Sequence, residues 1–243
     1  MLEGLQTAAA GLMAQQRRLD AISNDIANVS TTGYKRLRVG FRDLVYQDGG
    51  SGAGAGVRTG TGAAAVTVGR SLVPGALRQT DRALDVAIEG PGFIQVRRAD
   101  GTTALTRDGS LQVAGDGRLR TSTGELLEPP VTVPTGVGED LSIAPDGEVT
   151  GGGRTLGRIT IVDVPAPDGL QAIGDNLFVP TAASGGLRPA AGASVRQGLL
   201  EGSNVDIGDA MVDMIDAQRS FQLASKAITM QDEAWGIANG VRR

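Results

Sequence analysis

The chain of 243 residues contains no histidine and no cysteine. Without histidine it has no imidazole for Ser-His-Asp chemistry, for His-ligated zinc or for general-base catalysis near neutral pH. Without cysteine it has no thiolate nucleophile, disulfide, zinc ribbon or iron–sulfur cluster. An enzyme would depend on carboxylates, Lys, Ser, Thr or Tyr, and we assign no catalytic, metal-binding or cofactor-binding residue.

Aromatic residues and net charge are also low. Aromatic side chains make up 3% of the chain, whereas glycine accounts for 37 residues, a balance that disfavours an aromatic-lined ligand pocket and favours turns. The net charge is −4, with Lys and Arg scattered along the sequence. Since no basic stripe is available to follow a phosphate backbone, we expect no nucleic-acid partner.

Long apolar runs are missing as well. A membrane-spanning helix needs about 18 consecutive apolar residues, and no segment of this length occurs. The first residues lack a basic region and carry Glu3 and Gln6 within the apolar part, unlike a cleaved signal peptide.

Both ends of the sequence repeat large apolar residues every seven positions, the spacing of a coiled-coil seam. The N-terminal repeat predicts a helix from Leu2 to about Val29, ended by Ser30-Thr31-Thr32-Gly33, with Gly33 in a left-handed conformation. The C-terminal repeat predicts a helix from about 205 to 238, roughly 50 Å long, capped by Ser203 or Asn204. The repeats are Leu5, Leu12, Leu19 and Ile26 at the first end, and Ile207, Met214, Phe221, Ile228 and Trp235 at the second.

The second seam alternates these large residues with alanines, at positions 210, 217, 224 and 238. An apolar heptad is more often ordinary core than an assembly device. Here the length of the helix, the matching seam at the other end and the different sequence between them favour assembly.

The middle of the chain has the pattern of antiparallel strands. Short apolar runs alternate with Asp-Gly pairs at 100–101, 108–109 and 116–117, and Asp-Gly between strands is a strong hairpin signal. None of these pairs lies in the acidic pattern of a calcium loop. Gly60, Gly62 and Ala65 fit a dinucleotide-binding spacing, but no strand leads into them and no helix follows.

The predicted fold class is α+β, with long N- and C-terminal helices packed as a coiled coil and a central antiparallel β-rich domain. The expected divisions are a terminal helical domain (1–34 and 204–243), an extended glycine-rich connector (35–74) and a β-rich outer domain (75–203). Three classes of function stay open on this basis: a structural polymer subunit, a binding module on a helical stalk, and a carboxylate-dependent enzyme.

Two segments resemble signatures of the bacterial flagellar rod and hook proteins. They are "SNDIANVSTTGYKR", residues 23–36, and "QGLLEGSNVDIGDAMVDMIDAQRSFQLASKAI", residues 197–228. The middle is also similar to the family in "DVAIEGPGFIQV" and "TRDGSLQV". Within the family, "FRDLVYQ", residues 41–47, resembles the segment that distinguishes distal rod subunits from hook subunits; proximal rod subunits are the alternative.

The resemblance implies a structural subunit that leaves the cell through the flagellar type III export apparatus without a cleaved signal peptide. It would polymerise with copies of itself into a hollow helical shaft across the periplasm and transmit motor torque to the hook. Its other partners would be proximal rod proteins, hook or hook-junction proteins, and the P- and L-ring bushing proteins. We expect the subunit interface to include the nine seam residues named above together with Asn28, Gly33 and Asn204 of the two signatures.

Overall fold

The computed structural model describes residues 2–48, 58–60, 62–134, 136 and 140–240. The side chains of residues 2–5, 46–48, 58, 59, 238 and 239 are not included in that description. The chain forms two compact units. One, here the helical unit, contains Met1–Ala27, Leu37–Val68 and Asp206–Arg243, and the other, the β-rich unit, contains Asn28–Arg36 and Gly69–Val205.

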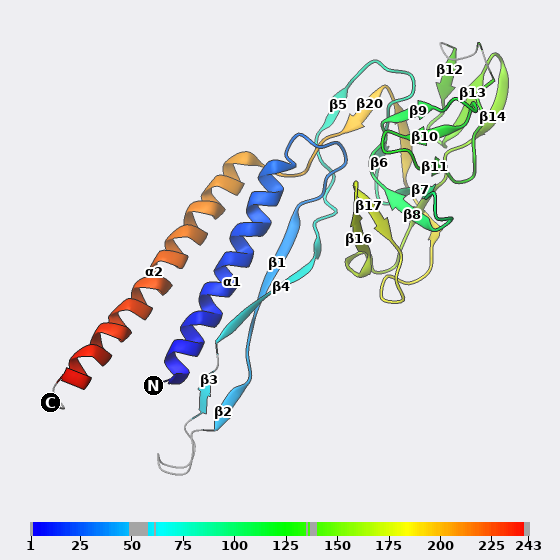
Figure 1. The fold of residues 1–243 in the computed structure, drawn as a ribbon. Coiled ribbons are helices and arrows are strands. Elements are labelled where there is room, and N and C mark those ends of the chain that lie inside the picture. The colour runs from blue at the N-terminus through cyan, green and yellow to red at the C-terminus, as the bar shows by residue number, and fades with distance from the viewer. Residues whose placement is uncertain (1, 49–57, 61, 135, 137–139, 241–243) are drawn as a thin grey trace. The chain divides into compact units, whose positions relative to one another are not determined.

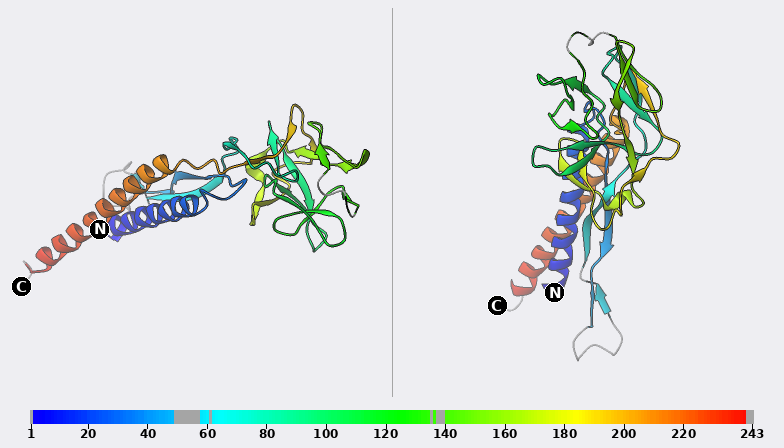
Figure 2. Two further views of the ribbon diagram at one scale, coloured as in Figure 1. Left: turned by 90° about the horizontal axis from the view of Figure 1, so that it is seen from above. Right: turned by 90° about the vertical axis from the view of Figure 1, so that its right-hand side faces the viewer.

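The helical unit is built on the first and last elements of the chain. Helix α1 spans Leu2–Ala27 and helix α2 spans Ile207–Gly240, so the heptads located both helices to within a few residues. The two helices lie side by side and run in opposite directions, and α2 continues past the first residue of α1 (Figures 1 and 2).

The N-terminus of α2 is capped by a residue other than the two that the sequence suggested. The carboxylate of Asp206 accepts a hydrogen bond from the backbone N–H of Asp209 at 3.0 Å, the geometry of an N-cap. Ser203 instead accepts from the N–H of Val205, and the Asn204 side chain is bonded to residues 36, 71 and 73. The predicted caps at Ser203 and Asn204 are therefore wrong.

Two antiparallel ribbons complete the helical unit within the stretch where the sequence suggested an extended connector. Strand β1 (Leu37–Asp43) pairs with β4 (Ala63–Arg70), and β2 (Tyr46–Asp48) pairs with β3 (Arg58–Gly60). The Asp25 carboxylate accepts a hydrogen bond from the N–H of Leu37 at 3.0 Å, which ties the start of β1 to α1. Most of the glycine-rich segment, residues 49–57 and 61, lies outside the described residues.

The β-rich unit is organised around one large antiparallel sheet, which has nine strands within the described residues. Its main path runs β16-β17-β8-β7-β11-β10-β9, and β15 adds to β7 and carries β18. The bounds of these strands are β7 Phe93–Arg97, β8 Thr103–Thr106, β9 Leu111–Val113, β10 Leu119–Thr121, β11 Leu126–Leu127, β15 Ile161–Asp163, β16 Gln171–Gly174, β17 Leu177–Val179 and β18 Arg188–Pro189.

Smaller antiparallel groups and one short 3-10 turn, Pro167–Gly169, complete the unit. Strands β12, β13 and β14 form a three-stranded sheet, β19 pairs with β6, and β20 pairs with β5. Their bounds are β5 Leu77–Gln79, β6 Val86–Glu89, β12 Leu141–Ile143, β13 Glu148–Gly151, β14 Arg154–Arg158, β19 Ser194–Gln197 and β20 Leu199–Glu201.

The core of the β-rich unit is aliphatic. Its main cluster includes Val96, Leu111, Leu119 and Val149, all fully buried. A second cluster surrounds Phe93 and Phe178, whose ring centroids are 5.7 Å apart. Aliphatic side chains on short strands thus form most of a core in which aromatic residues are few.

Two of the three Asp-Gly pairs form hairpin turns as predicted. Gly101 lies between β7 and β8, and Gly117 lies between β9 and β10, with φ of 83° and 81°. At Asp108-Gly109 the hairpin prediction is wrong, because β8 and β9 pair with other strands. Gly109 serves close packing instead: a Cβ there would lie 1.7 Å from the carbonyl oxygen of Val86.

The observed class is α+β, with an N-terminal helix, a β-rich middle and a C-terminal helix, as the sequence predicted. In the part of the chain that the structure describes, neither helix is sufficiently long and apolar to span a membrane.

Candidate assembly surface

The seam residues of α1 occupy its less exposed side. Leu12, Leu19 and Ile26 are half-buried, and Ala14 and Ile22 between them are buried. The side chain of Leu5 lies outside the described residues. Since leucine and isoleucine lose contact with water along this row, the N-terminal heptad contributes to the core of the helical unit.

On α2 the alanines are the most deeply buried members of the predicted seam. Ala210 and Ala217 are 2% and 0% exposed, whereas Met214, Phe221, Ile228 and Trp235 are half-buried. Ile207, at the first position of the helix, is 46% exposed. Small buried residues allow a neighbouring helix to approach closely, and larger residues on either side cover the line of contact.

One ion pair shows how the two helices are aligned. Arg18 of α1 donates to the carboxylate of Asp213 of α2 at 3.0 Å, and both side chains are about one-third exposed. A partly exposed pair of this kind adds little stability. It shows that the second half of α1 lies beside the beginning of α2.

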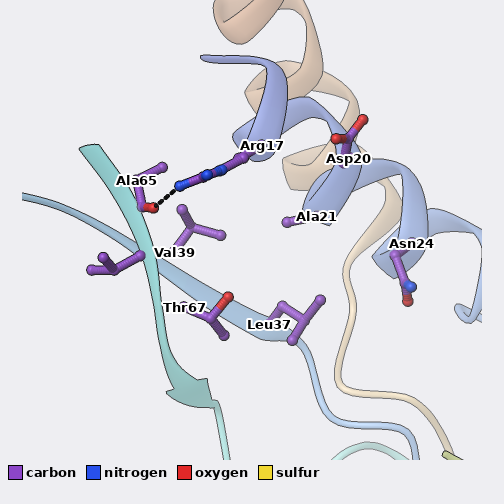
Figure 3. A pocket seen from close by; sticks show the side chains of 9 residues that line it. Arg17, Asp20, Ala21, Asn24, Leu37, Val39, Ala65 and Thr67 are labelled. Atoms are coloured by element: carbon purple, nitrogen blue, oxygen red, sulfur yellow. Dashed lines mark hydrogen bonds between the residues drawn. The ribbon is translucent and has the colours of Figure 1, made fainter. Parts of the chain in front are cut away.

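A pocket opens on the helical unit between α1 and the β1/β4 ribbon (Figure 3). It encloses about 300 Å³. Ala21, Leu37, Val39, Ala65 and Val66 supply apolar surface. The polar side chains that line it include Arg17, which donates to the carbonyl of Ala65 at 3.1 Å (Figure 3), and Asp20, which accepts from Gln16 at 2.9 Å. The pocket is thus an apolar depression with charged groups around it.

A second polar feature lies inside the β-rich unit, where three charged side chains meet. Lys35 donates to one carboxylate oxygen of Glu201 at 2.5 Å, and Arg107 donates to the other at 3.0 Å. All three residues are less than 5% exposed. The N–H of Gly75 donates to the same carboxylate, and the carbonyls of Val73 and Gly90 accept from the two cations.

The two positive neighbours determine the charge state of Glu201. Burial alone would raise the pKa of its carboxyl group, but the charge of Arg107 and the charge and hydrogen bond of Lys35 outweigh burial and hold that pKa below its ordinary value. Burial lowers the pKa of the Lys35 ammonium, and Glu201 opposes part of this shift. The cluster therefore depends on one carboxylate, which both cations contact.

This cluster joins segments that are far apart in the sequence. Lys35 follows the N-terminal signature glycine Gly33, and Glu201 precedes the C-terminal signature residue Asn204. The N–H of Gly33 donates to the carbonyl of Glu201 at 2.8 Å, and Asn204 accepts from the N–H of Arg36 at 2.7 Å. The parts of the two signatures that belong to the β-rich unit, residues 28–36 and 197–205, are thus held together.

The three signature residues expected at an interface make contacts within their own chain. Asn28 accepts a hydrogen bond from the Thr31 hydroxyl at 3.2 Å. Gly33 adopts φ of 69°, and a Cβ there would lie 2.7 Å from the backbone carbon of Arg107. The left-handed conformation was predicted, but α1 ends at Ala27, so Gly33 turns the chain beside residues 107–108 instead of capping the helix.

Sequence reasoning missed the buried charge cluster. Lys35, Arg107 and Glu201 are separated by about 70 and 90 residues in the chain, and no local period connects them. The one sequence signal that could have pointed to them is their position inside the segments that resemble the rod and hook proteins. Among the described residues, no group of three or more acidic side chains is placed to hold a metal ion.

Comparison with known families gives three matches in the order of the chain. Residues 5–35 match the flagella basal body rod protein family, residues 87–151 the D1 domain of flagellar hook protein FlgE/F/G, and residues 196–241 the C-terminal region of the flagellar basal body rod FlgEFG proteins. The first match covers most of α1, the third contains α2, and the second lies in the β-rich unit.

Full-length relatives agree with these matches. The chain is 39% identical to flagellar basal-body rod protein FlgG of Borreliella burgdorferi, over 100% of both chains. It is 38% identical to the protein of the same name from Agrobacterium fabrum, over 98% of both. It is 34% identical to the flagellar hook-basal body complex protein FlhP of Bacillus subtilis, over 100% of both.

Paired terminal helices and a β-rich unit between them in the sequence agree with these matches, which define a structural assembly subunit. The chain belongs to the flagellar basal-body rod protein family. As a member of that family it is a structural component of the basal body, and it assembles there with other flagellar proteins.

Proposed function

We propose that this chain is the subunit of the distal rod, and that its copies form a hollow helical shaft carrying torque from the motor to the hook. The full-length similarity to proteins named FlgG supports this assignment. The structural observation that carries it is the pairing of α1 and α2: the first and last elements of the chain form one helical unit, distinct from the β-rich unit.

The helical unit is the polymerising part of the subunit in this proposal. Its seam residues pack α1 on α2 as a coiled coil and so shape the surface that neighbouring copies meet, and Asn28, Gly33 and Asn204 belong to the same interface between copies. The β-rich unit faces outward. Burial of additional apolar surface between copies offsets the entropy of ordering two long helices, which a single helix pair offsets poorly.

The partners follow from this position. Besides copies of itself, the subunit contacts proximal rod proteins at one end of the shaft and hook or hook-junction proteins at the other, with the P- and L-ring proteins around it. It reaches the periplasm through the flagellar type III export apparatus. A proximal rod subunit of the same family is the second candidate.

Complementation tests the proposal. In a strain lacking the gene, the full chain should restore motility and complete basal bodies in electron micrographs, whereas a chain ending at Asp206, without α2, should restore neither. Purified full-length chain should form helical tubes; discrete small oligomers would instead favour a binding module. An epitope tag on the chain, located by immunogold labelling, should lie at the hook side of the rod, and labelling at the membrane side would favour the proximal candidate.

A further inference from the structure

Helix α2 carries a second apolar row in addition to its seam. Leu223, Met230 and Ile237 are spaced by seven residues, and Ala227 and Ala234 lie between them. Each large residue follows a seam residue by two positions, and two positions turn about 200° around a helix. This second row, here the outer row, therefore lies on the side of α2 opposite the seam.

The outer row is left uncovered by its own chain. Leu223, Met230 and Ile237 are 69%, 62% and 70% exposed, and both alanines between them are exposed. The end of α2 also continues past the first residue of α1 (Figures 1 and 2). Rows of exposed large apolar residues mark interaction surfaces in soluble proteins, and the large–small heptad is the pattern that fits helical packing.

The same unit offers a concave counterpart elsewhere on its surface. The pocket between α1 and the β1/β4 ribbon has apolar surface from Ala21, Leu37 and Val39 and holds about 300 Å³ (Figure 3). Ala21 points toward this space from α1 (Figure 3). The exposed row on α2 and the apolar depression between α1 and the β1/β4 ribbon are thus two different apolar surfaces of one unit.

We propose that the outer row of α2 inserts into the α1/β1/β4 pocket of a second copy of this chain. The inference rests on the proposed polymerisation and specifies its contact. If the outer row of one copy met the outer row of another, the contact would close into a dimer. A contact between two different surfaces instead leaves one surface of each kind free for further copies, so the assembly can extend without limit. The seam then serves packing within the chain, and the outer row serves packing between chains.

The absence of cysteine from the sequence makes disulfide cross-linking a clean test, because every thiol in a variant is an introduced one. The full chain carrying both Ala21→Cys and Met230→Cys is assembled into rods, oxidised and separated on a non-reducing gel. We expect a ladder of covalent dimers, trimers and longer chains. Each single variant should give no ladder, since Ala21 and Met230 would each face an unmodified residue.

A bond within one chain cannot imitate this result. Arg18 of α1 contacts Asp213 of α2, and Met230 lies almost five turns farther along α2, roughly 25 Å at about 1.5 Å per residue. A disulfide requires Cα atoms within about 7 Å. The matched control is Ala21→Cys with Ser225→Cys, which introduces an exposed cysteine two residues beyond Leu223 and so on a different side of α2.

The outcomes separate the contact from the proposed function. Rods that form normally but give no ladder with Ala21→Cys/Met230→Cys, or equal ladders with the Ser225→Cys control, would overturn the contact and leave polymerisation standing. Dimers from Met230→Cys alone would show that outer rows meet each other, and would also overturn it. Failure of the unmodified chain to form any rod would count against the proposed function itself.

A charge substitution covers the case in which the cysteine variants assemble poorly. Met230→Asp places a carboxylate in the proposed apolar contact, whereas Ser225→Asp places the same charge outside it. We expect Met230→Asp to abolish rods with the circular dichroism of the monomer unchanged, and Ser225→Asp to retain them. Normal rods from Met230→Asp would contradict the proposal.

Discussion

Lys35 and Glu201, 166 positions apart in the sequence, form an ion pair whose charged atoms are 2.5 Å apart and whose side chains are fully buried. Arg107 contacts the same carboxylate. Breaking a buried ionic group by removing one partner is costly, because the remaining charge stays desolvated. Here a single carboxylate is the partner of two cations.

Glu201→Gln should therefore destabilise the β-rich unit by about 3 to 5 kcal/mol or more. The amide preserves the shape of the side chain but removes the charge that both cations need. Urea unfolding of the full chain, followed by a signal of the β-rich unit, measures the change. The control is Glu89→Gln, which removes the partner of Arg196 in an exposed pair and should leave the unfolding midpoint almost unchanged; equal losses from both variants would refute the role of burial.

The buried carboxyl group of Asp108 should make the stability of the fold depend on pH, in a direction that follows from its pKa. Burial raises the pKa of its carboxyl group, against hydrogen bonds from the Ser110 N–H and the Ser122 hydroxyl, and the nearby Asp85 adds to the rise. Because this pKa is higher in the folded state than in the unfolded state, the protonated carboxyl group contributes stability below the unfolded-state pKa of about 3.9. This contribution is lost as pH rises through the folded-state pKa. Asp108→Asn removes the titration.

The stability of the unmodified chain relative to Asp108→Asn should thus be highest in acid and fall as pH rises toward neutrality. Urea midpoints of both chains, measured from about pH 3 to about pH 7 around the usual Asp value, provide the comparison. A relative stability that increases with pH would mean that the ionised carboxylate is favoured in the fold, contrary to the structure.

Gly33→Ala should destabilise the β-rich unit through two costs that act together. The backbone has φ of 69°, and an added Cβ would lie 2.7 Å from the carbonyl carbon of Arg107. Gly101→Ala is the matched control, since it shares a positive φ of 83° but has no atom within 4 Å of its added Cβ. The strain common to both is about 1 kcal/mol, and we expect the melting temperature to fall considerably more for Gly33→Ala.

Phe221→Ala tests the seam. The side chain is half-buried on α2, so its removal should cost somewhat less than the about 3 to 5 kcal/mol typical of a fully buried phenylalanine. We expect shortened or absent rods in electron micrographs, together with an unchanged β-rich unit. Gln218→Ala, at an exposed position nearly one turn earlier, should assemble normally. Full-length rods from Phe221→Ala would show that the seam is not required for assembly.

The sequence predicted those parts of the structure that depend on residues close together in the chain. Heptads located α1 and α2, and Asp-Gly pairs located the turns at Gly101 and Gly117, because a helix face and a two-residue turn depend on neighbouring residues. The turn at Asp108-Gly109 was misread because the same dipeptide there allows close approach to Val86, a contact that local sequence does not reveal.

The remaining features depend on tertiary proximity. The partners of Glu201 come from distant segments, and the pocket on the helical unit combines α1 with two strands from a stretch that the sequence suggested to be an extended connector. The outer row of α2 did lie in the sequence as a heptad. Only the observed exposure distinguishes it from the seam, since both rows carry the same kinds of residue.

The two apolar sides of α2 link the solubility of the free subunit to its ability to polymerise. A polar residue in the outer row would keep the subunit in solution and at the same time weaken the surface that copies need. Variants selected for high yield as monomers should therefore accumulate changes at Leu223, Met230 or Ile237, and the critical concentration for rod growth should rise with each such change.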